Sequence, residues 1–149
     1  MNASELWQEY QQKGHMDLSH ERYDAWQFGA APDKLLALVL EGTKCATASL
    51  YEGYEFEDEP VPNNMTYSVI LDSQNNAQCI IKNSQVIIQP FKEFDEKFAY
   101  IEGEGDRSLE YWRRVHIEFF KEEASRYGTE FTEDSLVVGE IFEVVYRIS

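Results

Sequence analysis

The chain has 149 residues, of which 43% are hydrophobic, and it carries a formal net charge of -15. This length supports one hydrophobic core, so we expect one domain over residues 1–149, with no run near the roughly 20 apolar residues of a membrane helix. The charge excludes duplex nucleic acid as a partner, because proteins that bind long nucleic acids neutralise the phosphates with clustered lysine and arginine. Two cysteines without CxxC spacing, and an N-terminus without a signal-peptide pattern, predict a reduced, cytoplasmic protein.

Hydrophobic periodicity and turn residues predict a mixture of helices and strands. In chain order the predicted elements are a helix over residues 4–13, a helix over 32–41, strands over 45–51, 66–71, 78–82 and 85–91, a helix over 108–127 and a strand over 136–148. The first helix belongs to an N-terminal extension over about residues 1–22. Residues 52–64, which contain acids and two prolines, are predicted to form a connecting loop.

The last strand and the long helix each contain residues with an informative position. The last strand has Gly139 inside it, a pattern that is typical of a strand carrying a β-bulge. The long helix carries Trp112, His116 and Phe119 on one apolar stripe. The stripe predicts that Trp112 and Phe119 belong to the core, and a buried, hydrogen-bonded histidine is the expected state of His116, with a role at a site as the alternative.

The segment Gly42-Thr43-Lys44-Cys45-Ala46-Thr47-Ala48-Ser49 places one lysine and two hydroxyl groups between a predicted helix and a predicted strand. Pro32 stands in the first turn of that helix and Gly42 follows its end, which is the usual placement of these residues. Side chains at such corners are held by rigid flanks and still reach solvent. The segment is therefore either a candidate site or a solvated surface lysine beside a strand. Because Lys44 follows the helix, replacing it with alanine is expected to leave stability near that of the wild type.

A second candidate segment is Glu102-Gly103-Glu104-Gly105-Asp106, just before the long helix. Its three carboxylates and lack of lysine exclude a phosphate-binding loop. The acids can cap the helix, because negative charge complements its N-terminal dipole, or one of them can act at a site. The three histidines of the chain have no metal-ligand spacing, so we expect neither a metal nor a cofactor.

The pattern Gly42-x-Lys44-x-x-Thr47-x-Ser49 resembles the G-x-K-x-x-T-x-R/S signature of ASCH domains, which are small PUA-like β-barrels associated with RNA and modified nucleosides. Further phrases agree in order over residues 26–120, and they are Trp26-Gln27-Phe28-Gly29, Cys79-Ile80-Ile81, Pro90-Phe91, Phe98-Ala99, Glu102 to Leu109, Trp112 and His116. Many members carry arginine where this chain has Ser49, which removes a strong hydrogen-bond donor. The resemblance implies an α+β fold with a PUA-like mixed β-barrel and surrounding helices.

In ASCH members that hydrolyse the amide of an acylated cytidine, a lysine, a threonine and a glutamate act, and the matching residues here are Lys44, Thr47 and Glu104. A lysine of lowered pKa would activate the threonine hydroxyl, whereas a charged lysine would stabilise an oxyanion while the glutamate moves protons. Both mechanisms stay open. Other members resemble ribonucleases, in which a lysine would neutralise the phosphate and a tyrosine or serine would assist. The candidates for that second role here are Tyr51 and Ser108.

These expectations converge on a cleft that holds a small RNA-derived ligand, namely a modified nucleoside, a nucleotide or a short single-stranded RNA. Its wall includes Trp26, Phe28, Ser49, Tyr51, Glu102 and Ser108, and hydrolysis by an amidohydrolase or ribonuclease-like reaction would occur at Lys44, Thr47 and Glu104. The alternative is a non-catalytic module that binds RNA or a protein. We expect Lys44 to be partly buried, with its ammonium within reach of a carboxylate of the 102–106 loop. Contact between Glu104 and Lys44 would favour the reactive site, and Glu104 capping the long helix would favour the binding module. The oligomeric state stays open.

Overall fold

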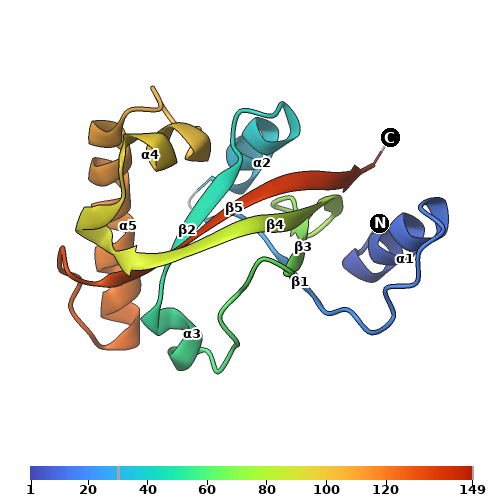
Figure 1. Cartoon of the computed structure of the whole chain (residues 1–149), viewed down its shortest axis with the longest axis horizontal. Helices are drawn as coiled ribbons and strands as arrows, with labels where there is room; N and C mark the ends of the chain where they lie inside the picture. Colours follow the sequence, from blue (N-terminus) through green and yellow to red (C-terminus); the bar gives the residue numbers. More distant parts are fainter. Residues whose placement is uncertain (30, 149) are drawn as a thin grey trace.

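The computed structural model describes residues 1–29 and 31–148. Its centre is one five-stranded sheet with the strand order β1-β3-β4-β5-β2, which curls into a half-barrel (Figure 1). The strands are β1 (Tyr23–Trp26), β2 (Ala46–Leu50), β3 (Tyr67–Leu71), β4 (Ala77–Pro90) and β5 (Leu136–Arg147). β1 pairs with β3 in parallel, and the other three pairs are antiparallel. The predicted α+β class and PUA-like mixed sheet are confirmed.

Helices lie around this sheet. They are α1 (Ala3–Lys13), α2 (Pro32–Leu40), α3 (Glu52–Phe56), α4 (Glu96–Glu102) and α5 (Leu109–Tyr127), with a short 3-10 turn η1 (Phe91–Glu93) after β4. α1 covers one end of the molecule and α5 stands at the other, beside α4 (Figure 1). In the described part of the chain, no helix has the length and apolar character needed to cross a bilayer.

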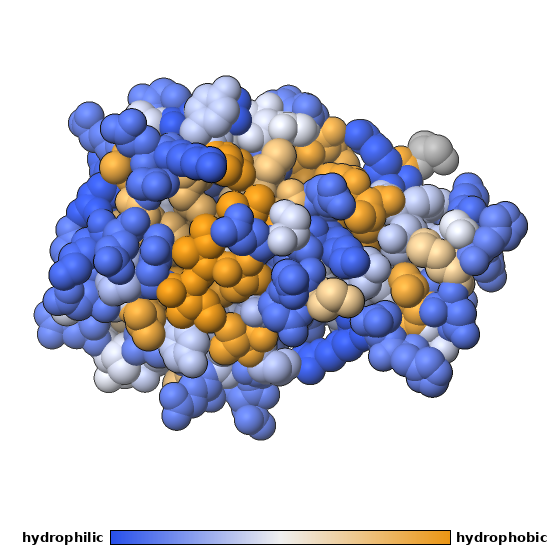
Figure 2. Space-filling view, viewed as in Figure 1, coloured by the Kyte–Doolittle hydropathy of each residue, from blue (hydrophilic) through white to orange (hydrophobic). Residues whose placement is uncertain are grey.

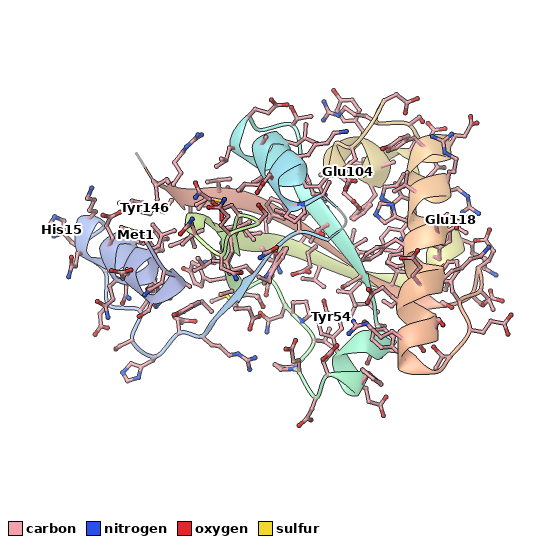
Figure 3. The ribbon with its side chains drawn as sticks, turned by 180° about the vertical axis from the view of Figure 1, so that it is seen from behind. Met1, His15, Tyr54, Glu104, Glu118 and Tyr146 are labelled. Atoms are coloured by element: carbon pink, nitrogen blue, oxygen red, sulfur yellow. The ribbon has the colours of Figure 1, made fainter. Side chains whose placement is uncertain are left out.

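The surface is mostly hydrophilic at the periphery, while apolar side chains gather over the middle of the sheet in the view of Figure 2. Seen from behind, α5 stands beside the opposite face of the sheet, with Glu104 near its upper end and Tyr54 near its lower end (Figure 3). The space that matters for function lies on this second face, between the sheet and α5.

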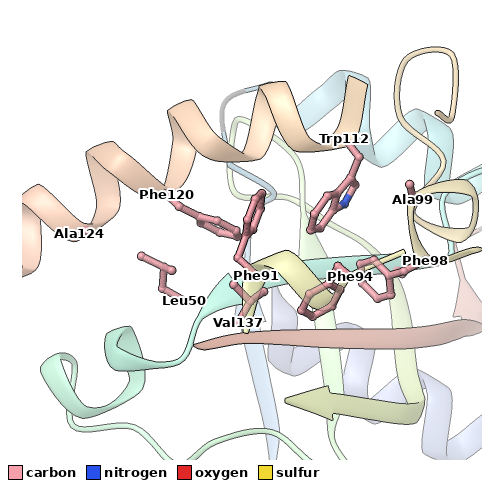
Figure 4. Close-up of a cluster of buried hydrophobic side chains, with 10 residues drawn as sticks. Leu50, Phe91, Phe94, Phe98, Ala99, Trp112, Phe120, Ala124 and Val137 are labelled. Carbon is pink, nitrogen blue, oxygen red and sulfur yellow. The ribbon is translucent and has the colours of Figure 1, made fainter. Parts of the chain in front are cut away.

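The core between α5 and the sheet is aromatic (Figure 4). The indole of Trp112 stacks on Phe91 with 5.2 Å between ring centroids and on Phe94 with 5.5 Å. Offset stacking adds to the burial of such rings. A Cβ atom at Gly139 would come within 2.8 Å of Phe94 and of Phe98, so this position must lack a side chain. Trp112 is therefore a core residue, as predicted, and it is also fixed in orientation.

The structure corrects three expectations about the elements and confirms a fourth. Residues 78–82 and 85–91 are parts of the single long strand β4, because the chain runs on through Asn83 and Ser84. β5 does carry the expected bulge, at Val145, because Ile80 pairs with Tyr146 and Ile81 with Val144, while Gly139 pairs regularly with both neighbouring strands. Helix α3 forms within the predicted loop 52–64, and α4 forms where we expected no element.

Candidate active site

Lys44 lies in a corner that backbone contacts hold from two sides. Gly42 adopts φ of +88° after α2, and the backbone N–H groups of Thr43 and Lys44 both donate to the carbonyl of Leu38 at 3.0 Å. The N–H of Cys45 donates to the carbonyl of Ile101 in α4 at 2.8 Å. A Cβ atom at Gly103 would lie 2.1 Å from the Thr43 carbonyl oxygen, so the end of α4 touches this corner directly. The two candidate segments of the sequence are thereby held together.

The side chain of Lys44 points inward and is 1% exposed. Its Nζ donates to the Ala46 carbonyl at 2.8 Å, to Glu104 Oε2 at 2.8 Å and to Glu102 Oε2 at 3.3 Å. Three acceptors require three N–H bonds, which only the charged ammonium form supplies. The prediction that a carboxylate of the 102–106 loop reaches Lys44 is confirmed, and the burial is deeper than the sequence indicated.

Glu102 is fully enclosed yet paired on both oxygens. Its Oε1 accepts from the indole Nε1 of Trp112 at 2.7 Å, and its Oε2 lies 3.0 Å from Nε2 of His116 and also faces Lys44. Burial by itself raises the pKa of this carboxyl, but the charges of Lys44 and His116 and the hydrogen bond with His116 outweigh it and lower the pKa of Glu102 well below its ordinary value. Glu102 is therefore ionised at neutral pH.

His116 completes the group. Its Nδ1 lies 2.8 Å from the Trp112 carbonyl oxygen, which can only accept, so we assign the proton to Nδ1. Burial lowers the pKa of His116, but the negative charge of Glu102 and the hydrogen bond to it outweigh burial and raise the pKa overall. An imidazolium would donate from both nitrogens. We call Lys44, Glu102, Glu104 and His116 the Lys44 cluster, which joins two cationic groups to two carboxylates.

Glu104 is the most exposed member of the cluster, since 16% of its side chain is exposed, against 9% for His116 and 1% for Lys44 and Glu102. Burial and the neighbouring Glu102 raise its pKa, although Lys44 acts in the opposite direction. Ser108 caps α5, accepting from the Tyr111 N–H at 3.1 Å, and it donates to Asp106 at 2.6 Å. Glu104 is thus free of the capping role and contacts Lys44 instead.

The cluster also has the spacing of metal ligands, because one atom each of Glu102, Glu104 and His116 lies within 4.8 Å of the others. The separation of these residues in the sequence gave no sign of this arrangement. Lys44 Nζ already donates to both carboxylates. A metal ion would have to displace the ammonium, so this donor set fits a lysine better than a metal.

A hollow of about 100 Å³ opens over the Lys44 cluster. Its apolar wall comprises Phe28, Leu35, Val115 and Phe119, and Thr47 of β2 contributes a hydroxyl. No described residue forms a hydrogen bond with that hydroxyl. The hydroxyl is accessible, because no fully enclosed polar side-chain atom of the described residues lacks a partner. Thr47 therefore faces the hollow with its hydroxyl available to a ligand.

A second hollow of about 360 Å³ continues from the first, and we call it the outer cavity. The two share Phe28, Gly29, Thr47, Ala48 and Phe119 in their walls, so together they form one cleft between β1, β2 and α5. Polar residues of the outer cavity are Asp24, Ser49, Tyr54, Glu59, Ser68, Glu123 and Glu140. Its volume lies within the roughly 300–1,000 Å³ typical of small-molecule sites.

The remaining candidate residues divide between cleft and surface. Trp26 and Ser49 line the outer cavity, where the Trp26 ring meets Phe28 edge to face and Ser49 Oγ lies 2.7 Å from the Tyr54 hydroxyl. Tyr51 is exposed and lines a separate hollow beside Ser135. Ser108 lines neither part of the cleft. The structure thus does not bring Tyr51 or Ser108 to Lys44.

The sequence did not single out Trp112, which lies beneath the cleft, or Glu140, and it gave a site role for His116 only as the alternative. His116 and Trp112 touch Glu102, but their positions on an apolar helical stripe predicted a core role. The i, i+4 spacing of these two residues was the available signal, since it places both on one face beside whatever α4 presents. Glu140 and Glu143 are the two acids inside the largely apolar strand β5, and an acid in such a strand was the signal missed.

Comparison with known proteins assigns the family. Residues 24–146 match the ASCH domain family. An ASCH domain structure from Lactobacillus crispatus JV V101 is 30% identical, with a TM-score of 0.87 over 97% of this chain and 94% of that chain. A protein of Enterococcus faecalis V583 matched to the family DUF984 is 36% identical, with a TM-score of 0.88 over 98% of this chain and 89% of that chain.

A more distant structure, an ASCH protein of Zymomonas mobilis, shares the fold at 11% identity, with a TM-score of 0.50 over 84% of this chain and 72% of that chain. The comparison with curated proteins gave no match. The family match covers most of the chain, from the start of the sheet to the end of β5, and includes every member of the Lys44 cluster. This chain therefore belongs to the ASCH domain family.

Proposed function

We propose that the protein hydrolyses the amide of a small, RNA-derived ligand, an acylated nucleoside, in the cleft over the Lys44 cluster. One observation carries the proposal: a buried ammonium is held by two carboxylates of which one, Glu104, has a raised pKa and faces the cleft. Groups whose pKa values are driven apart by their surroundings are the usual acid and base of an active site. Here Glu102 fixes the charge and Glu104 moves the proton.

Glu104 is the general base in this mechanism, and Lys44 is not. The three acceptors around Lys44 Nζ require its ammonium form, and an ammonium has no lone pair with which to take a proton. Glu104 removes a proton from a water molecule as the water oxygen bonds to the amide carbon. Protonation of Glu104 weakens its hydrogen bond to Lys44, which frees one N–H of the ammonium for the oxyanion that forms at the same moment.

The second step returns the proton. The tetrahedral intermediate collapses, the carbon–nitrogen bond breaks, and Glu104 gives its proton to the departing nitrogen, so the products are a carboxylic acid and a free amine. The Thr47 hydroxyl, which has no described partner, donates to the carbonyl oxygen and orients the amide. Phe28 and Phe119 supply apolar walls on which a base can stack.

The small size of the ligand follows from charge. A chain of net charge -15 repels a polyanion, so a nucleoside, a nucleotide or a short single strand is favoured over a duplex. Two free cysteines, Cys45 and Cys79, suit a reducing cytoplasm. The known association of ASCH domains with RNA supports the same class of ligand.

The test is an assay of the purified protein against acylated nucleosides, acylated nucleotides and short single-stranded RNAs, with products identified by mass spectrometry. We expect release of a carboxylic acid, and a loss of about 10²- to 10⁴-fold in kcat for Glu104→Gln. Glu118→Gln is the matched control, because this residue lies on α5 and lines neither part of the cleft. Equal turnover by Glu104→Gln and the wild type would overturn the mechanism.

The attacking group has its own test. If water attacks, Thr47→Ala keeps a reduced but measurable rate and no acylated protein accumulates. If the Thr47 hydroxyl attacks, Thr47→Ala is inactive, Thr47→Ser keeps much of the rate, and a covalent acyl adduct adds its mass to the wild-type protein. The first outcome is the one we expect.

A non-catalytic binding module is the second candidate. The observation that favours it is that every N–H of Lys44 is already satisfied and that Lys44 and Glu102 are each only 1% exposed. A cluster with such saturation can act purely as a structural centre below a binding cleft. Saturable binding of a nucleoside without release of any product would support this function and contradict hydrolysis.

A further inference from the structure

The floor of the outer cavity carries two buried polar side chains with unused hydrogen-bonding capacity. Glu140 of β5 is 8% exposed, and its Oε1 accepts from Asn83 Nδ2 at 2.9 Å. No described residue donates to its other oxygen. Ser68 of β3 is 4% exposed, and its hydroxyl has no partner among the described residues. No fully enclosed polar side-chain atom of the described residues lacks a hydrogen-bond partner. The unpartnered oxygens of Glu140 and Ser68 are therefore accessible, and both residues line the cavity.

The surroundings of Glu140 favour a hydrogen-bond donor from a ligand. Burial is the largest influence and raises the pKa of Glu140, Asp24 raises it further, and the hydrogen bond from Asn83 only partly offsets them. A carboxyl group that is removed from water and has one hydrogen-bond partner is stabilised when a ligand hydroxyl donates a second hydrogen bond to it. The Ser49–Tyr54 hydroxyl pair lies in the same wall and offers two more polar atoms.

The charge of the outer cavity excludes phosphate. Its walls contain the carboxylates of Asp24, Glu59, Glu123 and Glu140, and no lysine, arginine or histidine among the described residues. Asp24 pairs with Arg22, and Glu123 pairs with Arg126, but both arginines are largely exposed and lie outside the lining. A phosphate group would therefore meet carboxylates at close range without a cation to bind it.

The two hollows give an order to the ligand's parts. Phe28 and Phe119 line both hollows, so a ligand that extends through the cleft with its reacting amide at Glu104 has its other end in the outer cavity. The group that follows a base in a nucleoside is a sugar. Carboxylates of proteins commonly accept hydrogen bonds from ribose hydroxyls, as in dinucleotide-binding folds.

Resting on the proposed function, we propose that the outer cavity is a sugar subsite, in which Glu140 accepts a hydrogen bond from a ribose hydroxyl and Ser68 and Tyr54 contact the same sugar. The substrate is thereby a free nucleoside, and a nucleotide or an RNA strand is excluded. Glu140 is a specificity-determining residue in this arrangement and takes no part in the proton transfer at Glu104.

The experiment compares three substrates that share one acylated base: the nucleoside, its 5′-monophosphate and its 2′,3′-dideoxy analogue. Loss of hydrogen bonds to a charged group should lower kcat/KM of the dideoxy analogue by about tenfold or more. The monophosphate should be poorer still, because close like charges cost several kcal/mol, or about 100-fold or more. Glu140→Gln should reduce the ratio of kcat/KM for the nucleoside to kcat/KM for the monophosphate.

Glu143→Gln is the matched control, since it makes the same charge change on β5 outside the outer cavity and should leave both ratios unchanged. Equal kcat/KM for the nucleoside and the monophosphate would overturn the sugar subsite while hydrolysis stands. If no compound is hydrolysed, the proposed reaction fails, and calorimetry with the deacylated nucleoside and its monophosphate decides this inference. Tighter binding of the nucleoside supports it, and equal binding or none overturns it.

Discussion

The pKa values of two buried glutamates, at the two ends of the cleft, shift in opposite directions. Glu102 accepts from Trp112 and faces the charges of Lys44 and His116, and its pKa is lowered. Glu140 accepts from Asn83 alone, and its pKa is raised. Both lie in the interior and both are glutamates. The difference teaches that partners, more than burial, decide the direction in which the pKa of a buried carboxyl shifts in this molecule.

The difference also separates two kinds of chemistry. At the Lys44 cluster the charges are fixed by one another, and only Glu104 has the freedom to exchange a proton with the cleft. At the outer cavity the acceptor capacity is left open for a ligand. A ligand is therefore recognised at one end and reacts at the other.

Breaking the Lys44 cluster should have the largest effect. Lys44→Met should cost about 3–5 kcal/mol of stability, because it leaves Glu102 buried without its main counter-charge. The sequence led to the opposite expectation, a stability near wild type, because it did not indicate that Lys44 is buried. Chemical denaturation measures the difference. Lys92→Met, which breaks the exposed pair with Asp134, is the control and should change stability little. A Lys44→Met protein as stable as the wild type would contradict the assigned burial.

The second effect isolates one partner of Glu102. Trp112→Phe keeps an aromatic ring in the core but removes the indole N–H that donates to Glu102, and should cost about 1.5–3 kcal/mol, as for other hydrogen bonds to charged groups. Trp26→Phe is the matched control, since Trp26 is half-buried and its indole makes no hydrogen bond among the described residues. Equal losses in the two variants would show that the Trp112 hydrogen bond contributes nothing.

The sign should reverse at the other glutamate. Since the pKa of Glu140 is higher in the fold than in the unfolded chain, its ionisation disfavours folding at pH values above its folded pKa. Glu140→Gln should therefore leave stability unchanged or raise it by about 1 kcal/mol at pH 7, with the gain vanishing as the pH falls. Glu102→Gln should destabilise at the same pH. Destabilisation of equal size by both changes would refute the comparison.

The smallest effect concerns His116, whose pKa is raised in the fold above its ordinary 6.5. A raised histidine pKa contributes stability that is fully present below the unfolded value and is lost as the pH rises through the folded value. The stability difference between wild type and His116→Gln should therefore shrink by about 1 kcal/mol from pH 6 toward alkaline pH. A difference that stays constant with pH would mean that His116 is neutral throughout.

The sequence predicted the outline of the fold well and the site in part. Proline at the start of α2, glycine after its end and the stripe of α5 located both helices, because these signals are local. The contact between Lys44 and the 102–106 loop was also predicted, from the motif and the acids before a long helix. Helices α3 and α4 were missed, because each spans two turns or fewer of weak pattern and depends on packing against neighbours.

The remaining features depend on contacts that no local pattern records. Lys44 was placed at a solvent-reaching corner, whereas the approach of Gly103 to Thr43 closes that corner and buries the side chain. The bulge of β5 was expected from Gly139, but it lies at Val145, and the missing side chain of Gly139 makes room for Phe94 and Phe98. The pairing of His116 with Glu102 depends on how α5 crosses the end of α4, which periodicity does not specify.

The most direct test is a ¹³C NMR titration of the carboxyl carbons of the wild-type protein, with Glu102, Glu104 and Glu140 assigned through their glutamine variants. We predict that Glu102 stays ionised down to pH values below the ordinary glutamate range, while Glu104 and Glu140 titrate above that range. A protonated Glu102 at neutral pH, or one common pKa for the three residues, would contradict the account that partners set the charge at each end of the cleft.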